Sequence, residues 1–290
     1  MRDRGEPPLA TVGIPFYDEE RDLHAAVRSI LRQTMSAIEV LLVDDGSRDR
    51  SLEIARSFDD ARITVISDGR HRGLPARLNQ IARCARANVI VRMDADDVAH
   101  PTRLARQLAA LEETGSDAVG AWVALVDARG QVFGIIEAPA TVRTSEQVLE
   151  LGVFPHATMV ARRSWLLANP YDESLTRAED RELFCRTIRT ARFAVVPEVL
   201  YVVRVRTHSK SFLADYRASH AQNRIIFRRY GPALVGRTQT IRNLAISYAK
   251  SVVMTAAVRL GGAERIVRRR GRAPRADELA MAREAIERAQ

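Results

Sequence analysis

The chain has 290 residues, enough for one large α/β domain or for two lobes that share a core. Its hydrophobic fraction of 46% is ordinary for a soluble protein, and no uncharged apolar run reaches the roughly 18–20 residues of a membrane span. The net charge of +9 suits an anionic ligand or membrane surface, whereas motifs of nucleic-acid-binding folds are absent, so we expect no nucleic-acid partner.

The cysteines and the first residues indicate a reducing compartment. Cys84 and Cys185 lie far apart in helix-like patterns and make neither a disulfide framework nor a zinc site. Residues 1–12 lack the apolar core of a signal peptide. We therefore expect a cytoplasmic protein.

Strands and helices are predicted to alternate through residues 9–93. Apolar runs with the length of buried strands lie at 9–14, 40–43, 63–66 and 89–93, and apolar residues recur at helical spacing between them. This alternation predicts right-handed βαβ units, and therefore an α/β fold with a mostly parallel central sheet flanked by helices.

Three of these strands end in polar loops, which read PFYD at 15–18, DDGS at 44–47 and DADD at 94–97. Ligands of parallel sheets bind beyond the carboxyl ends of the strands, so the loops predict a site on one edge. The second loop could also be only a turn and a helix cap. No GxGxxG or GxxxxGK[ST] motif is present, so a nucleotide here would be held by carboxylates and a metal.

The DADD loop is the candidate metal site. Asp94, Asp96 and Asp97 place three carboxylates within four residues, and like charges so close need a positive partner. Mg²⁺ or Mn²⁺ takes oxygen ligands and leaves coordination places for phosphate oxygens. The alternative is a solvated acidic loop that caps the helix beginning at Pro101.

Further elements are predicted along the rest of the chain. They are a helix from Pro101 to Gly115, strands at 118–126 and 132–136, a short helix with a Thr144–Gln147 capping box, strands at 157–161 and 199–206, and helices at 176–189, 213–230 and 237–260.

The helix at 176–189 carries a second group of acids. Asp180 shares a helix face with Leu183 and Phe184, which places a carboxylate in line with the buried stripe, where it is a candidate general base. Alternatively, Asp180 and Glu179 only complement the helix dipole. His208 follows the next strand and could complete a metal shell with Asp96, although a lone histidine is more often structural.

The C-terminal region is predicted to be helical and rich in arginine. Residues 252–258 are apolar nearly all round, and six arginines with no acid between them lie from Arg265 to Arg275. This pattern is typical of a peripheral contact with an anionic membrane. The alternative is that the helix packs on the catalytic domain or on a second subunit of a homodimer.

A series of motifs in chain order resembles a known family. They are VGIPFYDEE, LLVDDGSRD, GLPARLN, MDADD, FPHATMVARRS, YDESLTRAEDREL and VRVRTHSKS, between about residues 12 and 211. The series is similar to the inverting family 2 glycosyltransferases, which have a Rossmann-like GT-A fold. The resemblance implies a nucleotide-diphosphate sugar donor, expected to be a UDP-sugar, and Mn²⁺ or Mg²⁺.

By position, the resemblance assigns residues to the donor. Pro15 and Tyr17 would contact the base and ribose, Asp45 would hydrogen-bond the base, and Arg77 would lie near the nucleotide. Asp94 would be the first acid of the family's DxD motif and would also contact the nucleotide.

The remaining assignments concern the metal and the acceptor. Asp96 would be the better metal ligand, and His208 would face the diphosphate or the metal. Asp180 would be the catalytic base, and Glu179 and His156 would border a carbohydrate or lipid-linked acceptor.

This sequence departs from the family at two places. Asp18 stands where Asn is usual, and Asn169-Pro170 replaces Gly-Gly, which puts the shape of the acceptor loop in doubt. The Gln-x-x-Arg-Trp motif and the membrane helices of processive synthases are absent, so transfer of a single sugar is expected.

Three segments are expected. Residues 1–98 would form the nucleotide-sugar-binding half, residues 99–232 the acceptor-binding and catalytic half, and residues 233–290 a helical extension. The predicted function is metal-dependent, inverting sugar transfer in polysaccharide or glycolipid assembly, at the inner face of the plasma membrane if the membrane contact holds. The alternatives are a nucleotidyltransferase, whose Gly-rich phosphate loop is missing, and an inactive sugar-nucleotide-binding scaffold.

Overall fold

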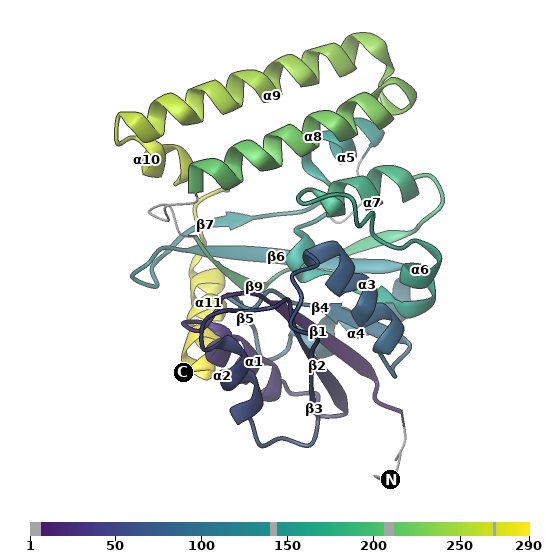
Figure 1. The fold of residues 1–290 in the computed structure, drawn as a ribbon, viewed down its shortest axis with the longest axis vertical. Coiled ribbons are helices and arrows are strands. Elements are labelled where there is room, and N and C mark those ends of the chain that lie inside the picture. Colours follow the sequence, from purple (N-terminus) through teal and green to yellow (C-terminus); the bar gives the residue numbers. More distant parts are fainter. Residues whose placement is uncertain (1–6, 140–143, 206–211, 269–270) are drawn as a thin grey trace.

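The computed structural model describes residues 7–139, 144–205, 212–268 and 271–290. A nine-stranded sheet runs through the molecule with helices on both faces (Figure 1). The strands are β1 Ala10–Phe16, β2 Ile38–Asp44, β3 Ile63–Ser67, β4 Val89–Arg92, β5 Val98–Ala99, β6 Ala118–Val126, β7 Val132–Ile136, β8 Val160–Arg162 and β9 Phe193–Arg204. Their order is β3-β2-β1-β4-β8-β6-β9-β5, and β7 pairs with β6 off this path.

The helices mostly follow the predicted pattern. They are α1 Leu23–Leu31, α2 Ser51–Ser57, α3 Leu74–Cys84, α4 Arg103–Thr114, α5 Ser145–Leu151, α6 Arg163–Ala168, α7 Glu179–Thr187, α8 Phe212–Leu234, α9 Gly236–Arg259, α10 Ala263–Val267 and α11 Ala276–Ala289, with a short 3₁₀ helix, η1, at His156–Thr158. The predicted Thr144–Gln147 capping box is present at the start of α5. No prediction was made for α6, α10 or α11 as separate elements.

The first half of the sheet is parallel. β1 pairs in parallel with both β2 and β4, and β2 pairs in parallel with β3. Every residue of β1 and β2 is buried, because α1 and α4 pack on one face of the sheet while α3, α6 and α7 pack on the other. Burial on both faces explains why these strands are continuous apolar runs.

The second half of the sheet mixes strand directions. β8 runs antiparallel to β4 and β6, while β9 runs parallel to β6. β9 begins at Phe193, earlier than the predicted residue 199, because the strand accommodates Pro197 where its register with β6 shifts. The strand predicted at 157–161 is instead η1 followed by β8.

The C-terminal helices leave the sheet and then return to it. α8 and α9 pack against each other as an antiparallel pair at one end of the molecule (Figure 1), and α11 packs on β9, β5 and α1. The helical C-terminal extension is therefore present, but its last helix completes the core beside β5. Strands from both sides of the expected boundary at residue 98 belong to one sheet. The expected division into a nucleotide-sugar-binding half and an acceptor-binding half stays a prediction.

Candidate active site

The predicted site loops follow neighbouring parallel strands. β1 lies between β2 and β4, with Phe16 opposite Asp44 and Gly13 opposite Arg92. The chain segments that leave these three strands therefore emerge at the same edge of the sheet. This confirms the geometric premise of the prediction, since strand order and direction bring the PFYD, DDGS and DADD loops together.

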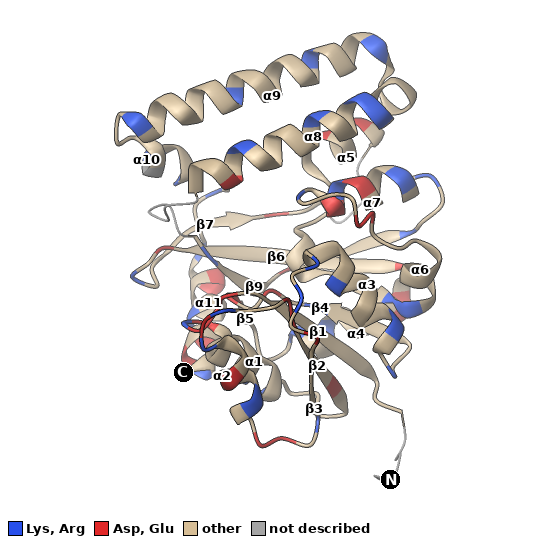
Figure 2. Ribbon diagram, viewed as in Figure 1, with Lys and Arg blue, Asp and Glu red and all other residues tan. Residues whose placement is uncertain are grey.

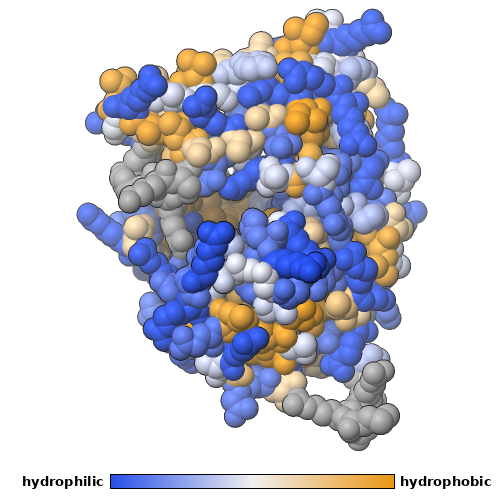
Figure 3. Space-filling view, viewed as in Figure 1, coloured by the Kyte–Doolittle hydropathy of each residue, from blue (hydrophilic) through white to orange (hydrophobic). Residues whose placement is uncertain are grey.

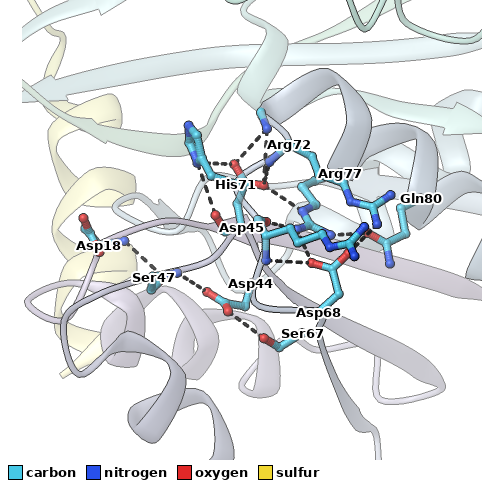
Figure 4. A network of polar contacts seen from close by, with 12 residues as sticks. Asp18, Asp44, Asp45, Ser47, Ser67, Asp68, His71, Arg72, Arg77 and Gln80 are labelled. Carbon is cyan, nitrogen blue, oxygen red and sulfur yellow. Dashed lines mark hydrogen bonds and ion pairs between the residues drawn. The ribbon is translucent and has the colours of Figure 1, made fainter.

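A network of polar contacts surrounds Asp45 (Figure 4). Its Oδ1 accepts hydrogen bonds from Arg77 Nε at 2.8 Å and from the backbone N–H of Arg72 at 2.7 Å. Its Oδ2 accepts from the Gly73 N–H at 3.0 Å and lies 2.9 Å from His71 Nδ1. Asp45 thus fixes the loop before α3 against the end of β2, and its predicted hydrogen bond to the base stays a prediction.

Arg77 holds this network from inside the protein. Its side chain is fully buried and reaches Asp68 at 2.7 Å and Gln80 at 2.8 Å, besides Asp45. Burial alone would lower the pKa of Arg77, but the Asp68 and Asp45 carboxylates raise it above its ordinary value. Arg77 therefore supports the wall of the predicted nucleotide site, and its contact with a nucleotide stays a prediction.

Tyr17 forms the aromatic part of this edge. Its ring lies 4.4 Å, centroid to centroid, from the ring of His71, whose side chain is 60% exposed. Pro15 is buried inside β1 opposite Val43, so of the two residues assigned to the base and ribose only Tyr17 is partly exposed.

Asp18 explains one departure from the family pattern. Its φ of 53° is left-handed, and its carboxylate accepts a hydrogen bond from the Arg48 N–H at 2.7 Å. Both Asn and Asp tolerate this conformation and offer a side-chain oxygen, so Asp can replace Asn here.

An arginine inside β4 pairs with the first acid of the DADD loop. Arg92 Nη2 lies 2.7 Å from Asp94 Oδ1, and Arg92 Nη1 lies 2.8 Å from Asp94 Oδ2. The backbone N–H of Asp94 donates to Tyr201 Oη at 3.0 Å. Burial opposes the charge of Arg92, yet Asp94 raises its pKa. The Asp94 side chain stays 32% exposed, so it presents one edge of an organised ion pair to the site.

The remaining acids of the loop differ in burial: Asp96 is half-buried, whereas Asp97 is buried and its Oδ1 accepts a hydrogen bond from the Arg204 N–H at 3.1 Å. Burial and the charges of Asp96 and Asp94 raise the pKa of Asp97 well above its ordinary range. The effect of these charges on Asp97 indicates that the three carboxyl groups lie close together, and Asp94 and Asp96 offer the oxygen donors that Mg²⁺ and Mn²⁺ prefer. Within the described residues, no three acidic, histidine or cysteine side chains form a complete metal cage. His208 lies outside the described residues, and its role stays a prediction.

Glu179 and His156 lie together, as expected of two residues on one side of a site. His156 Nδ1 lies 3.5 Å from Glu179 Oε1, and His156 Nε2 lies 2.8 Å from the hydroxyl of Tyr171. Burial would raise the pKa of Glu179, but the contact with His156, together with a backbone hydrogen bond and the charge of Arg92, lowers the pKa below its ordinary value. Just before them, Ala178 has a left-handed φ of 61°, a strain that is often stored at functional sites.

Asp180 differs from its neighbour. It is half-buried in the first turn of α7, and no hydrogen bond or ion pair from the described part of the chain engages its carboxylate. Of the two adjacent acids, Glu179 is paired and Asp180 is available to a ligand.

The acids that follow β4 and the acids that begin α7 influence the same charged and polar groups. The charge of Arg92 acts on Asp94, on Glu179 and on the phenol of Tyr171. Burial chiefly raises the pKa of Tyr171, and the charges of Glu179 and Asp180 add to this. Ionic groups that perturb one another lie close in space. The backbone supports this: the Arg92 N–H donates to the Met159 carbonyl at 2.8 Å, and His156, three residues before Met159, contacts Glu179. The strand that leads into the DADD loop therefore lies beside the first turn of α7.

The Asn169-Pro170 loop, the second departure from the family pattern, is held by hydrogen bonds from two helices. Asn79 exchanges two hydrogen bonds with the backbone of Tyr171, at 2.9 and 3.0 Å, and Arg186 Nη2 donates to the Pro170 carbonyl at 2.8 Å. The Asn169-Pro170 loop is thus tethered to α3 and α7 without the usual glycines.

Sequence reasoning missed Arg92, His71, Tyr171 and Tyr201 as parts of the site. Arg92 could have been found, because an arginine inside an otherwise apolar strand must be paired when it is buried. The other three were missed because their partners lie far away along the chain, as with Tyr201 and Asp94.

The chain is similar to known glycosyltransferases. Residues 11–166, more than half of the chain, match the model of Glycosyl transferase family 2. EpsJ of Bacillus subtilis, an uncharacterized glycosyltransferase, is 32% identical over 217 residues, which cover 70% of this chain and 62% of EpsJ.

Solved structures share the fold. The mannosyltransferase PcManGT of Pyrobaculum calidifontis, in complex with GDP-Man and Mn²⁺, has a TM-score of 0.62 at 18% identity, covering 98% of this chain and 86% of that one. S. aureus TarS in complex with UDP-GlcNAc has a TM-score of 0.58 at 17% identity, covering 97% and 89%. These likenesses confirm the predicted GT-A-type α/β fold. By its sequence match, the chain belongs to Glycosyl transferase family 2 and is a glycosyltransferase.

Proposed function

We propose that the protein transfers one sugar from a nucleotide-diphosphate sugar to an acceptor hydroxyl, with inversion at the anomeric carbon. The observation that supports the proposal is the link between β4, which leads into the DADD loop, and the first turn of α7. It runs through the bond from the Arg92 N–H to Met159 and the contact of His156 with Glu179. The acid-rich loop suits a divalent cation that would offset the negative charge of the donor's diphosphate, and the unengaged Asp180 suits an acceptor that must lose a proton.

In the proposed reaction, Asp180 takes the proton of the acceptor hydroxyl as its oxygen attacks the anomeric carbon. The bond from that carbon to the diphosphate breaks, and the electron pair leaves on the diphosphate oxygen. One displacement inverts the configuration and needs no covalent intermediate. Glu179 and His156 would hold the acceptor, and their mutual contact keeps both in place.

Asp96, with Asp94, would hold a divalent cation, which when bound would neutralise the charge of the departing diphosphate. The Arg92–Asp94 ion pair fixes one end of this acidic loop. Mn²⁺ in PcManGT supports a metal in this fold, and the choice between Mn²⁺ and Mg²⁺ stays a prediction.

The nucleotide is proposed to lie between Tyr17 and the Asp45 network. PcManGT is in complex with GDP-Man and TarS with UDP-GlcNAc, so the fold accepts both nucleotides and the expected UDP-sugar stays a prediction. A carbohydrate or lipid-linked acceptor fits a role in polysaccharide or glycolipid assembly.

A thermal-shift screen of nucleotide diphosphates with and without Mn²⁺, followed by donor hydrolysis and transfer assays, tests the proposal. A specific nucleotide at a hundredfold excess over its Kd should stabilise the fold by about 2.7 kcal/mol. A nucleotide that binds only with metal and whose sugar conjugate is turned over supports the proposal. Absence of any nucleotide-dependent shift would contradict it, and transfer of a nucleotidyl group would favour the nucleotidyltransferase alternative.

A further inference from the structure

The outer side of the α8–α9 pair carries a groove that the proposed reaction does not use. Its volume is about 740 Å³, and Arg217 and Arg224 of α8 line it together with Tyr248, Ser251 and Arg259 of α9. The groove is open to solvent along the pair, and the residues between the arginines are mostly small.

The opposite side of α8 is already occupied. Ile226 and Phe227 are buried in the core that α5 and α7 share. At the turn, a Cβ on Gly231 would lie 2.5 Å from Thr240 Oγ1, so this glycine permits the close approach of α9. His220 Nδ1 lies 3.0 Å from Ser247 Oγ and joins the helices further along. The groove therefore lies on the side that no other described element covers.

The charged residues of the α8–α9 pair are almost all basic (Figure 2). α8 and α9 carry four basic residues each, against one acid, Asp215, which pairs with Arg177. Among the described residues, no carboxylate pairs with Arg217, Arg224 or Arg259. An unneutralised cluster of this kind attracts anions.

The groove is also organised to receive an anion. The Arg224 guanidinium lies 4.3 Å from the centroid of the Tyr248 ring and within 3.4 Å of Ser251 Oγ. A stacked arginine is held in place without losing its charge, because its partners are neutral. A guanidinium fork beside hydroxyl groups matches the oxygens of a phosphate.

Aliphatic side chains of α9 and of Leu260, which follows it, lie exposed beside these charges. Val252, Val253 and Leu260 are 68%, 57% and 85% exposed. Hydrophobic and hydrophilic residues alternate over this end of the molecule (Figure 3). None of the described helices has both the length and the apolarity to cross a bilayer. Basic side chains beside exposed aliphatic ones suit a contact with an anionic membrane surface, because the negative surface potential attracts the basic groups.

We propose that the α8–α9 pair docks on an anionic phospholipid bilayer. A lipid phosphate lies between Arg217, Arg224 and Arg259, and the exposed valines enter the headgroup region. A second copy of the chain is the less favourable occupant, because two hairpins of the same positive charge repel each other while an anionic leaflet complements both.

This surface differs from the arginine-rich tail expected to make the contact. Arg268 lies 2.9 Å from Asp127, and Arg272 lies 2.6 Å from Glu137 and also pairs with Glu278. These two arginines hold the C-terminal segment on the sheet domain. The tail therefore uses part of its charge in internal pairs, whereas Arg217, Arg224 and Arg259 of the α8–α9 pair have no carboxylate partner among the described residues.

Docking would also position the acceptor side of the site, an implication that rests on the proposed function. α8 contacts the segment before α7 through Arg229 and Asp172 at 3.4 Å, and α7 itself through Tyr230 Oη and Glu182 Oε1 at 2.5 Å. A membrane-bound hairpin would hold α7 close to the lipid surface, which favours a lipid-linked acceptor.

Co-sedimentation of the full chain with vesicles tests the docking without any donor. The vesicles are phosphatidylcholine with and without phosphatidylglycerol, at low and high salt. R217Q/R259Q should weaken partitioning roughly thirtyfold, since each basic side chain at an anionic surface contributes about 1 kcal/mol. The control R56Q/R83Q removes the same charge from α2 and α3 and should leave partitioning nearly unchanged. Both control arginines are exposed.

Several outcomes would overturn the docking proposal. They are equal partitioning of wild type and R217Q/R259Q, an equal loss in the control, and binding that ignores phosphatidylglycerol or salt. Stabilisation by pyrophosphate that R217Q/R259Q abolishes, without vesicle binding by wild type, would assign the groove to a soluble anion. A dimer in light scattering that V252S/V253S dissociates would assign the face to a second copy. Because nucleotide-dependent thermal shifts are measured without lipid, failure of the docking and failure of the proposed function are distinguishable.

Discussion

Asp180 and Glu179 are adjacent acids with different surroundings, and this difference separates their roles. Glu179 is buried and contacts His156, whereas Asp180 is half-buried without a partner among the described residues. A general base needs an acceptor atom that is open to the substrate. Within the described part of the chain, the Asp180 carboxylate keeps both oxygens open, whereas Glu179 Oε1 contacts His156. The geometry therefore favours Asp180 as the base and Glu179 as a residue that shapes the acceptor side.

Replacing Asp180 with Asn tests this division. The variant keeps the size of the side chain but cannot take a proton, so kcat should fall about a hundred- to ten-thousandfold. Nucleotide binding by calorimetry should barely change, because Asp180 is assigned to the acceptor. Near-normal transfer would place the base elsewhere, with Glu179 the first residue to test.

Replacing Asp96 with Ala tests the metal site. The metal-dependent part of the nucleotide-induced thermal shift should disappear while the fold persists, because the loop would lose an oxygen donor. Glu113→Ala on α4 is the control, since it removes an exposed acid far from the loop in sequence. Turnover by Asp96→Ala with an unchanged Mn²⁺ dependence would show that Asp96 is not a ligand.

At the scale of elements, α3 organises the nucleotide side of the site through Arg77. Replacing Arg77 with Met would leave the buried Asp45 carboxylate without its guanidinium partner. Breaking a buried pair in this way typically costs about 3–5 kcal/mol, and urea unfolding should show a loss near the lower end because His71 and backbone N–H groups still contact Asp45.

Arg72→Met is the matched control for Arg77→Met. Arg72 also pairs with Asp68, but its side chain is 50% exposed, so this substitution should change stability by less than about 1 kcal/mol. Equal losses in the two variants would contradict the structural role assigned to Arg77.

The contribution of α11 to the free energy of unfolding is expected to depend on pH through Glu278. Hydrogen bonds and charge from Arg272 lower the pKa of Glu278 below its ordinary value of 4.5. A lowered folded-state pKa contributes stability that is fully present above the unfolded value and is lost as the pH falls through the folded value. Glu278→Gln should therefore cost roughly 1–2 kcal/mol in urea unfolding at pH 7.

The difference between wild type and Glu278→Gln should shrink as the pH drops below about 4.5. A difference that stays constant down to pH 3 would mean that the charge of Glu278 does not anchor α11.

Across the whole molecule, stability should be uneven. β1 and β2 lie in the middle of the sheet with both faces covered, whereas α9 packs mainly on α8 and α10. Segments with few buried contacts open at lower free energy than the core. Native-state hydrogen exchange should therefore show much faster exchange in α9 than in β1 and β2, with α8 between them. Equal protection of α9 and β2 would contradict this picture.

Local patterns in the sequence determined much of the fold. The first four strands, β6 and β7, and the helices between them were predicted from periodicity, chain-breaking residues and the Thr144–Gln147 capping box. Each of these signals lies within one short stretch of chain. The placement of three loops on one edge also followed, because parallel strands joined by helices leave little freedom in where their ends lie.

Only the tertiary structure decided which residues meet. The contact of Glu179 with His156, the bond from Asp94 to Tyr201 and the return of α11 to β5 and β9 join segments far apart in the chain. Such contacts depend on strand order and register, and local periodicity does not specify either of them. A polar residue shows its type in the sequence, but whether it is paired or available to a ligand depends on neighbours that folding brings to it.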